Sequence, residues 1–184
     1  MKRCWDSSDP AYNAYHDEEW GRPVTEEAGV YERLCLEGFQ SGLSWLTILR
    51  KRENFRSAFA GFEPDAVARF GDRDIVRLLG DAGIVRHRGK IEATIQNARS
   101  TVELRDSTPL HELVWSYRRD EPVADEWFAQ TPDSVELSKR LRKAGFRFVG
   151  PTTVYAGMQA IGVVNDHRAD CFVREEVEQE RMAL

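Results

Sequence analysis

The sequence predicts an all-α fold, and three observations support this prediction. Apolar residues recur at intervals of three or four, as at Ile91, Ile95, Ala98 and Val102, which is the period of an amphipathic helix. Residues that favour helix starts precede several such stretches. The alternation typical of strands is almost absent, and only the short apolar stretch FRFVG at 146–150 is a candidate for extended structure.

The first predicted helices lie between the N-terminal segment and the middle of the chain. One runs from Glu26 to about Phe39, with Thr25 as its cap and two glutamates in its first turn, where acidic side chains suit the helix dipole. The next follows Ser44 and turns basic residues toward solvent. Two shorter helices follow Pro64 and Asp72.

The later helices have equally local signals. A long helix begins near His87 and continues to about Leu104, and its start is basic. Proline is favoured at the first position of a helix, and glycine often follows the last. On this basis three further helices are predicted: after Thr108-Pro109, from Ser134 to a stop at Gly145, and from Pro151 onward.

Length and composition predict one folded domain, residues 1–184. Apolar residues make up 41% and charged residues 31% of the chain, which is ordinary for a globular protein. No apolar run approaches the roughly 20 residues needed to cross a bilayer, so we expect no membrane contact and a cytoplasmic location. The three cysteines are then more often buried, catalytic or metal-binding than cross-linked.

Charge is unevenly distributed along the chain. The net charge is -5, but residues 44–105 carry twelve Lys/Arg against eight Asp/Glu. Binding of a charged partner depends on local fields more than on the total. The middle of the chain is therefore a candidate surface for an anion.

Two histidines and two cysteines near the chain ends are candidate metal ligands. His167 and Cys171 are four positions apart and share a face if that stretch is helical. A structural zinc site needs two more nitrogen or sulfur ligands, and Cys4 and His16 are the best candidates. Neighbouring aspartates, Asp17 and Asp166, suggest hydrogen-bond partners for the histidines. The residues alone leave open that these are surface histidines and small buried cysteines; Cys35 is interpreted as core.

Residues 78–98 read as a helix, a glycine-bounded turn and a second helix. Gly83 and Gly89 allow unusual dihedrals and close approach, and free N–H groups at a helix start can bind a phosphate. Arg86, Arg88 and Lys90 add positive charge there. The alternative is an ordinary helical hairpin with solvated basic residues.

Aromatic residues are concentrated between residues 5 and 45, where seven of the nineteen in the chain occur. Aromatic rings beside an acid can stack on a flat ligand and satisfy its polar edge. Glu37 is the candidate acid, because it stands among apolar residues; buried and anionic, it would need a cationic partner. The alternative is that the aromatics are core and Glu37 points outward.

Four long motifs, in this order, resemble the DNA-3-methyladenine glycosylase I (Tag) family. The resemblance spans nearly the whole chain, and it departs from the family pattern at Ser41, where alanine is common, and in the spacing between Cys4 and Trp5. The motifs are RCWDSSDPAYNAYHDEEWG, CLEGFQSGLSW, AGIVRHRGKIEATIQNA and FVGPTTVYAGMQAIGVVNDHRADC.

The resemblance implies a helix-hairpin-helix DNA glycosylase fold, with the helix-hairpin-helix at about 72–105. It also implies a structural Zn²⁺ that joins the N- and C-terminal segments, and no organic cofactor. The site residues that it implies fall into three groups: zinc ligands Cys4, His16, His167 and Cys171; a base pocket of Tyr12, Tyr15, Trp20, Glu37 and Trp45, with Glu37 as the catalytic residue; and DNA contacts at Gly42, Leu43, Gly83, Arg86, Arg88, Gly89 and Lys90.

The implied activity is excision of 3-methyladenine from alkylated double-stranded DNA by a monomeric, monofunctional enzyme that flips the damaged nucleotide. Anionic Glu37 and the stacked aromatics would recognise the cationic base. Two alternatives remain open. One is a glycosylase of the same fold for another lesion, and the other is a non-catalytic helix-hairpin-helix module that only binds DNA.

Overall fold

The structure, a computed structural model, describes residues 2–119 and 128–184. These residues form helices and no strand, which confirms the all-α prediction. No helix in these two ranges is long and apolar enough to span a membrane. The elements are α1 (Pro10–Glu18), α2 (Glu27–Gln40), α3 (Trp45–Ala58), a short 3₁₀ helix η1 (Ala60–Phe62), α4 (Pro64–Val67), α5 (Asp72–Gly80), α6 (Arg88–Leu104), α7 (Leu110–Trp115), α8 (Pro132–Lys143), α9 (Pro151–Ile161) and α10 (Arg174–Met182).

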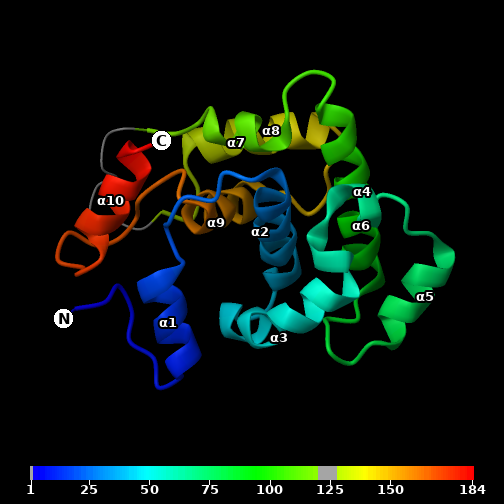
Figure 1. Cartoon of the computed structure of the whole chain (residues 1–184), viewed down its shortest axis with the longest axis horizontal. Helices are drawn as coiled ribbons and strands as arrows, with labels where there is room; N and C mark the ends of the chain where they lie inside the picture. Colours follow the sequence, from blue (N-terminus) through cyan, green and yellow to red (C-terminus); the bar gives the residue numbers. More distant parts are fainter. Residues whose placement is uncertain (1, 120–127) are drawn as a thin grey trace.

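Helix α2 lies at the centre of the molecule, between α9, α6, α3 and α7 (Figure 1). Nine of its fourteen residues are buried, which is why its sequence is apolar over more than one face. The approach of α9 is close: a Cβ on Gly157 would lie 2.8 Å from Cδ2 of Leu34. The central helix is thus fixed along its length, and any side chain that it presents to a cavity is held firmly.

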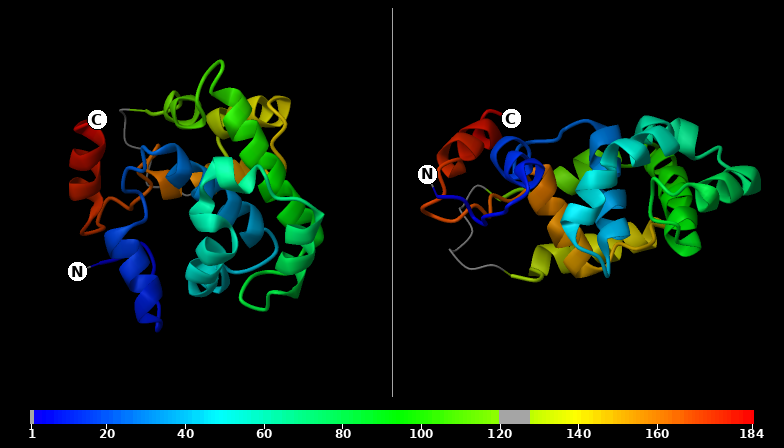
Figure 2. Two further views of the ribbon diagram at one scale, coloured as in Figure 1. Left: turned by 45° about the vertical axis from the view of Figure 1, so that its right-hand side comes forward. Right: turned by 90° about the horizontal axis from the view of Figure 1, so that it is seen from below.

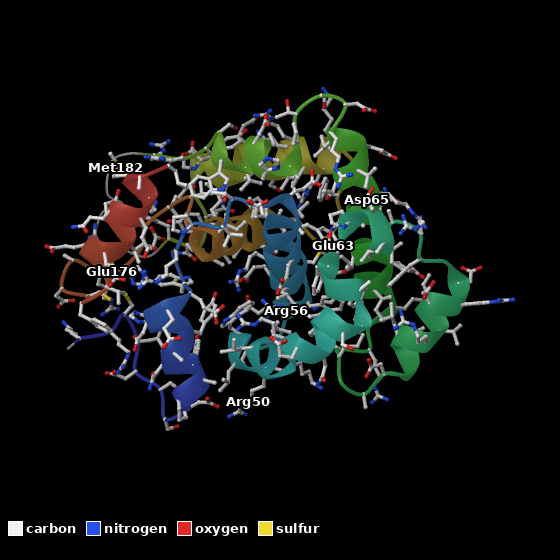
Figure 3. All side chains as sticks on the ribbon, viewed as in Figure 1. Arg50, Arg56, Glu63, Asp65, Glu176 and Met182 are labelled. Atoms are coloured by element: carbon white, nitrogen blue, oxygen red, sulfur yellow. The ribbon has the colours of Figure 1, made fainter. Side chains whose placement is uncertain are left out.

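The two ends of the chain lie together at one end of the molecule, and α5 lies at the opposite end (Figures 1 and 2). Arg22, after α1, forms ion pairs with Glu176 and Glu180 of α10, and Glu176 is visible on that helix in Figure 3. The buried Arg181 donates from Nε to the carbonyl of Gly162 at 2.7 Å. These contacts hold α10 against the segment that follows α9.

Several predicted helix starts are confirmed. Ser44 precedes α3, and its Oγ accepts a hydrogen bond from the Thr47 N–H at 3.3 Å. His87 precedes α6, which ends at Leu104 as predicted. Helix α9 begins at Pro151. The FRFVG stretch lies outside any helix.

Other helix starts differ from the predicted ones by one or two residues. Thr25 is not the cap of α2, which begins one residue later and has no side-chain cap. Helix α8 begins at Pro132, because Thr131 accepts from the Ser134 N–H. Helix α7 begins at Leu110, with Pro109 just outside it. Helices α1 and α10 were not predicted. The start of α1 does have a local signal, because Asp9 is its N-cap and Pro10 is its first residue.

Gly162 ends α9 with a φ of +85°, and a Cβ there would lie 2.6 Å from the Gly21 carbonyl oxygen. We expect Gly162→Ala to lower the free energy of unfolding by about 2 kcal/mol or more, because the left-handed conformation and the backbone clash add. Urea unfolding measures this. Gly80→Ala is the matched control, since nothing lies within 4 Å of a Cβ at that helix end. An equal loss in both variants would contradict the prediction.

Candidate functional site

A cavity of about 210 Å³ opens beside the C-terminal half of α2. It is smaller than the roughly 300–1,000 Å³ of pockets for drug-sized ligands, so it suits a ligand the size of a single ring system. Its walls come from the N-terminal segment, α1, the α1–α2 loop, α2, α3 and α9. The lining residues are Trp5, Tyr12, Tyr15, Trp20, Glu37, Gln40, Trp45, Ala156 and Gln159.

The five residues predicted for the pocket, Tyr12, Tyr15, Trp20, Glu37 and Trp45, all line this cavity. Four more were not assigned from the sequence. Trp5 lies between two predicted residues, with its ring centroid 5.3 Å from Tyr12 and 4.9 Å from Trp20. Gln40 had a local signal, since it stands three positions after Glu37 and so shares its helix face. Ala156 and Gln159 come from distant α9 and had none.

The aromatic rings form a surface suited to a flat ligand. Tyr15 and Trp45 have ring centroids 5.3 Å apart, with the planes tilted by 43°. Both residues are nearly buried, at 4% and 8% exposure. The indole Nε1 of Trp45 is buried and has no hydrogen-bond partner among the described residues. Such rings offer stacking area while their own conformations are fixed by packing.

The carboxyl group of Glu37 is buried in the wall of this cavity, and the residue is 5% exposed. Burial raises the pKa of Glu37 to about 8, opposed only by the positive charge of Arg33. At neutral pH the free protein therefore holds mainly the protonated acid. The expectation of an anionic Glu37 concerns the complex with a cationic base, and it stays a prediction.

Arg33 is the nearest candidate partner, but its charge is shared with another acid. Glu19 accepts from Arg33 at 3.2 Å and from both Nη atoms of Arg52 at 2.6 and 2.8 Å. One carboxylate thus faces two guanidinium groups, and Nη1 of Arg33 is buried with no hydrogen-bond partner among the described residues. Glu37 is the one acidic residue among the described residues that line the cavity.

The four predicted metal ligands lie together, although they come from opposite ends of the chain. One donor atom from each of Cys4, His16, His167 and Cys171 lies within 4.8 Å of the others, and all four residues are buried. Sγ of Cys4 is 3.4 Å from Nδ1 of His167. Sγ of Cys171 is 3.5 Å from Nε2 of His16 and 3.5 Å from Nδ1 of His167. The cluster has the donor set of a site for a soft divalent cation.

Each histidine has its second ring nitrogen engaged outside the cluster. Nδ1 of His16 lies 2.8 Å from Asp17, which Arg3 holds in turn. Nε2 of His167 lies 3.0 Å from the Trp20 carbonyl. Protons on these outer nitrogens leave the inner ones unprotonated, as metal ligation requires, and Nε2 of His16 also accepts a hydrogen bond from the Cys4 N–H at 3.1 Å. Asp17 was predicted for this role and fills it.

Two details of the predicted cluster are wrong. Asp166 accepts hydrogen bonds from Tyr155 and Gln159, at 2.6 Å each, while a backbone carbonyl orients His167. Residues 167–171 are not helical, because α9 ends at Gly162 and α10 begins only at Arg174. Close approach of His167 and Cys171 comes from a turn instead.

Burial favours the neutral forms of two cluster residues. It lowers the pKa of His167 to about 4 and raises the pKa of the Cys4 thiol. A bound cation would displace the thiol protons, since thiolate is the ligand form.

The cluster and the cavity share a wall. The Trp5 ring lies 4.7 Å from that of His16, and the Trp20 ring lies 4.6 Å from that of His167, both edge-on. These two tryptophans also line the cavity. The cluster therefore positions part of the aromatic surface, and loosening it would disturb the cavity.

Helices α5 and α6 are joined by the turn at residues 81–87, as predicted from the glycine-bounded stretch. Gly83 and Gly89 do not have positive φ values, so the predicted unusual dihedrals are wrong. Close approach of a phosphate stays a prediction; at Gly83 a Cβ would lie 2.9 Å from Oδ1 of Asp81, which accepts a hydrogen bond from the Gly83 N–H at 2.7 Å. Lys51 of α3 binds the turn from outside, at 2.9 Å from the Ala82 carbonyl.

Lys90 is not a surface cation, which corrects its assignment as a side-chain DNA contact. It is 8% exposed, and its Nζ donates to the carbonyls of Phe39 at 2.8 Å and Ser41 at 2.6 Å. These carbonyls lie at the end of α2, where a cation is favourable. Its N–H is also engaged, by Nδ1 of His87 at 3.2 Å.

The other predicted DNA contacts lie at the surface. Arg86 and Arg88 are exposed, and Arg88 has only a 3.4 Å contact with Glu92. Gly42 has a φ of +83° in the turn between α2 and α3, and a Cβ there would meet nothing within 4 Å. Leu43, the next residue, is 42% exposed.

The chain matches the methyladenine glycosylase family model over residues 5–175. It is 48% identical to DNA-3-methyladenine glycosylase 1 of Escherichia coli (strain K12) over 179 residues, which is 93% of this chain and 96% of that protein. A crystal structure of 3-methyladenine DNA glycosylase I has a TM-score of 0.88 and 46% identity, covering 93% and 98% of the two chains. A variant of such an enzyme in complex with 3-methyladenine has a TM-score of 0.86 and 35% identity, covering 91% and 94%.

We expect Glu37→Gln to stabilise the protein in a pH-dependent way. The pKa of Glu37 rises from 4.5 to about 8 on folding, so between these values the folded state binds the proton more tightly than the unfolded chain. The free energy of unfolding of the wild type therefore falls as pH rises through this range. The Glu37→Gln variant does not titrate at this position, so it does not lose this stability.

The difference between the two proteins should be near zero at pH 4.5 and on the order of 4 kcal/mol at pH 8, in favour of the variant. Urea unfolding of both proteins at the two pH values measures it. Other titrating groups contribute equally to both proteins. A difference that does not change with pH would mean that Glu37 ionises normally.

Proposed function

Because the chain belongs to the methyladenine glycosylase family, we propose that it is a DNA-3-methyladenine glycosylase that hydrolyses the N-glycosidic bond of 3-methyladenine in alkylated DNA. It releases the base and leaves an abasic site, the first step of base excision repair. The observation that carries this function is the cavity of Tyr12, Tyr15, Trp20, Trp45 and Trp5 with Glu37 buried in its wall.

Recognition depends on charge. Methylation at N3 makes adenine in DNA cationic, and a cation stacked on aromatic rings gains cation–π attraction. The positive charge also favours the ionised form of Glu37, so the neutral acid releases its proton to solvent as the base enters. The carboxylate then accepts charge-assisted hydrogen bonds from the polar edge of the base. Unmethylated adenine lacks this charge.

The chemical step needs little acid catalysis, because the cationic base is already a good leaving group. Water attacks the sugar carbon C1′ and the C1′–N9 bond breaks. The bonding electron pair moves to the base, which leaves neutral, and the attacking water loses one proton to solvent. Glu37 contributes by holding the base, its negative charge having offset the cost of burying the cation. It is the catalytic residue.

The enzyme reaches the base by flipping the nucleotide out of the duplex, which costs a few kcal/mol. We assign α5, the turn at 81–87 and α6 as the helix-hairpin-helix motif. Arg86, Arg88 and the backbone near Gly83 and Gly89 contact phosphates, while Gly42 and Leu43 enter the gap left by the base. Such contacts position the duplex and make binding salt-dependent.

The enzyme is monofunctional. Cleavage of the DNA strand by a glycosylase needs an amine nucleophile, and no lysine is among the described residues that line the cavity. Lys90 is held at the end of α2 by two carbonyls. Monomeric state, a cytoplasmic location, a single domain at 1–184 and the absence of an organic cofactor stay predictions from the sequence.

The Cys4, His16, His167 and Cys171 cluster is proposed to hold Zn²⁺. In a tetrahedral zinc site, metal–sulfur distances of about 2.3 Å and metal–nitrogen distances of about 2.0–2.1 Å place neighbouring donors roughly 3.3–3.8 Å apart. The Sγ–N distances of 3.4 and 3.5 Å in the cluster support this. The ion would join the chain ends without taking part in the reaction.

The activity test is release of 3-methyladenine from methylated duplex DNA, with the freed bases identified by chromatography. We expect the wild type to release 3-methyladenine, and Glu37→Gln to release it about 10- to 100-fold more slowly, because a charge-assisted contact is lost. Glu32→Gln is the control on the same helix; Glu32 is buried against Arg56, outside the cavity.

Three other results would lead to different conclusions. Release of a different base from damaged duplexes would indicate a glycosylase for another lesion. Binding of DNA without release of any base would indicate the non-catalytic module. Equal losses in Glu37→Gln and Glu32→Gln would remove the specific role of Glu37.

The zinc proposal predicts that Cys171→Ala loses bound zinc and melts at least about 5 °C lower, because the metal contributes directly to folding. Elemental analysis of the purified protein and thermal melting measure both. Cys35→Ala is the control: it is an equally buried thiol outside the cluster, and should keep one zinc per chain. Unchanged zinc content and melting in Cys171→Ala would contradict the proposal.

A further inference from the structure

Phe148 is an exposed aromatic residue in an unfavourable backbone conformation. Its φ is +55°, one of three positive values at non-glycine residues in the described ranges, and the residue is 39% exposed. A bulky residue in the left-handed region is strained. Such strain persists only where the surroundings enforce it, and it is concentrated at functional sites.

The surroundings of Phe148 do enforce this conformation. On one side, buried Asn97 of α6 accepts from the Arg147 N–H at 2.7 Å and donates to the Arg147 carbonyl at 3.1 Å. On the other side, the buried Ser138 of α8 donates to the Val149 carbonyl at 2.6 Å. The residue is held from both directions, so its ring is presented in a fixed position.

That position lies between the end of α2 and the start of α6. Cβ of Phe148 is 3.4 Å from an ideal Cβ on Gly38, which directly follows Glu37, and Cζ is 3.9 Å from one on Gly89. The ring centroid is 6.2 Å from that of His87. Lys90 holds the same end of α2 through Ser41, next to Leu43. The turn after α2 and the start of α6, both proposed to contact DNA, therefore lie close to Phe148.

The chain around Phe148 is strongly basic. Residues 137–165 contain five Lys/Arg and no acidic residue, in a chain of net charge -5. Lys139 pairs with Glu136, and Arg140 lies over the Tyr117 ring. Arg142 and Arg147 are exposed, and no ion pair to an acid is seen for either within the described ranges. Exposed cations around an apolar ring fit a polyanion that carries aromatic bases.

We propose that Phe148 is a second apolar contact to the substrate duplex, packing against a base beside the flipped nucleotide, with Arg142 and Arg147 on adjacent phosphates. The inference rests on the proposed function and extends its DNA surface beyond the hairpin and Leu43. Apolar side chains that insert at a base step stabilise distorted DNA, and an aromatic ring can stack on an unpaired base.

The test measures binding to a duplex that contains a tetrahydrofuran abasic-site analogue, by fluorescence anisotropy. Phe148→Ala should weaken binding about tenfold, because stacking or wedge contacts are lost. Phe128→Ala is the matched control, with the same residue type and 42% exposure, and it should bind as the wild type does. Binding of free 3-methyladenine, followed by tryptophan fluorescence, should be unchanged in both variants.

A second substitution separates DNA binding from folding. Phe148→Gly removes the ring and the steric strain of a positive φ together. It should melt no lower than Phe148→Ala, yet lose the same DNA affinity. Arg147→Gln should weaken binding to undamaged and abasic duplexes alike, and reduce the slope of log K against log salt by about 0.9.

Wild-type affinity in both Phe148 variants would overturn the inference, as would a loss shared by Phe128→Ala. Base release distinguishes the two proposals. If the wild type binds the duplex but releases no base, the proposed activity fails, while a selective loss in the Phe148 variants still supports the DNA contact. If base release is normal and Phe148→Ala binds normally, only the contact is refuted.

Discussion

A carboxyl group buried in the wall of an aromatic cavity is the constraint on which the proposed site depends. Glu37 lies on the central helix α2, whose other residues are packed against four helices, so the acid cannot move to solvent. The free-energy cost of burying the ionised carboxylate raises the pKa of Glu37. A core selected only for stability would place an apolar residue there. In the proposed function, a positively charged base completes the environment of this group.

The aromatic wall that faces Glu37 depends in turn on how the chain ends are held. Trp5 and Trp20 contact the cavity on one side and the rings of His16 and His167 on the other. Neither tryptophan belongs to a helix, so their ring positions depend on tertiary contacts, although the Trp20 N–H also bonds to the Tyr15 carbonyl at the end of α1. Joining the ends through the cluster, and through α10, supplies a rigidity that short terminal segments lack on their own.

Much of the fold was predictable, because its signals are local. Ser44, His87 and Pro151 act on residues within one turn, and the helices that they start are observed where expected. Lys90 was placed wrongly for the opposite reason. Its two carbonyl partners are about fifty residues away, and a lysine in a basic stretch looks the same whether it faces solvent or ends another helix. The residues alone suggested the cluster and an aromatic pocket with Glu37, and the family resemblance supported both, but neither the ionisation of Glu37 nor the strained Phe148 can be deduced from residue types.

A neutral acid in the empty cavity gives selectivity that a permanent carboxylate would not. With a permanently ionised Glu37, small cations and water would compete for the site before a base arrived. With a pKa of about 8, the acid ionises readily only when the incoming ligand brings its own positive charge, since the proton must be displaced. Near neutral pH, removing the proton from Glu37 costs little free energy. At lower pH the proton competes more strongly with the cationic base. The same burial that destabilises the fold thus lets the pocket distinguish a charged base from a neutral one of nearly equal shape.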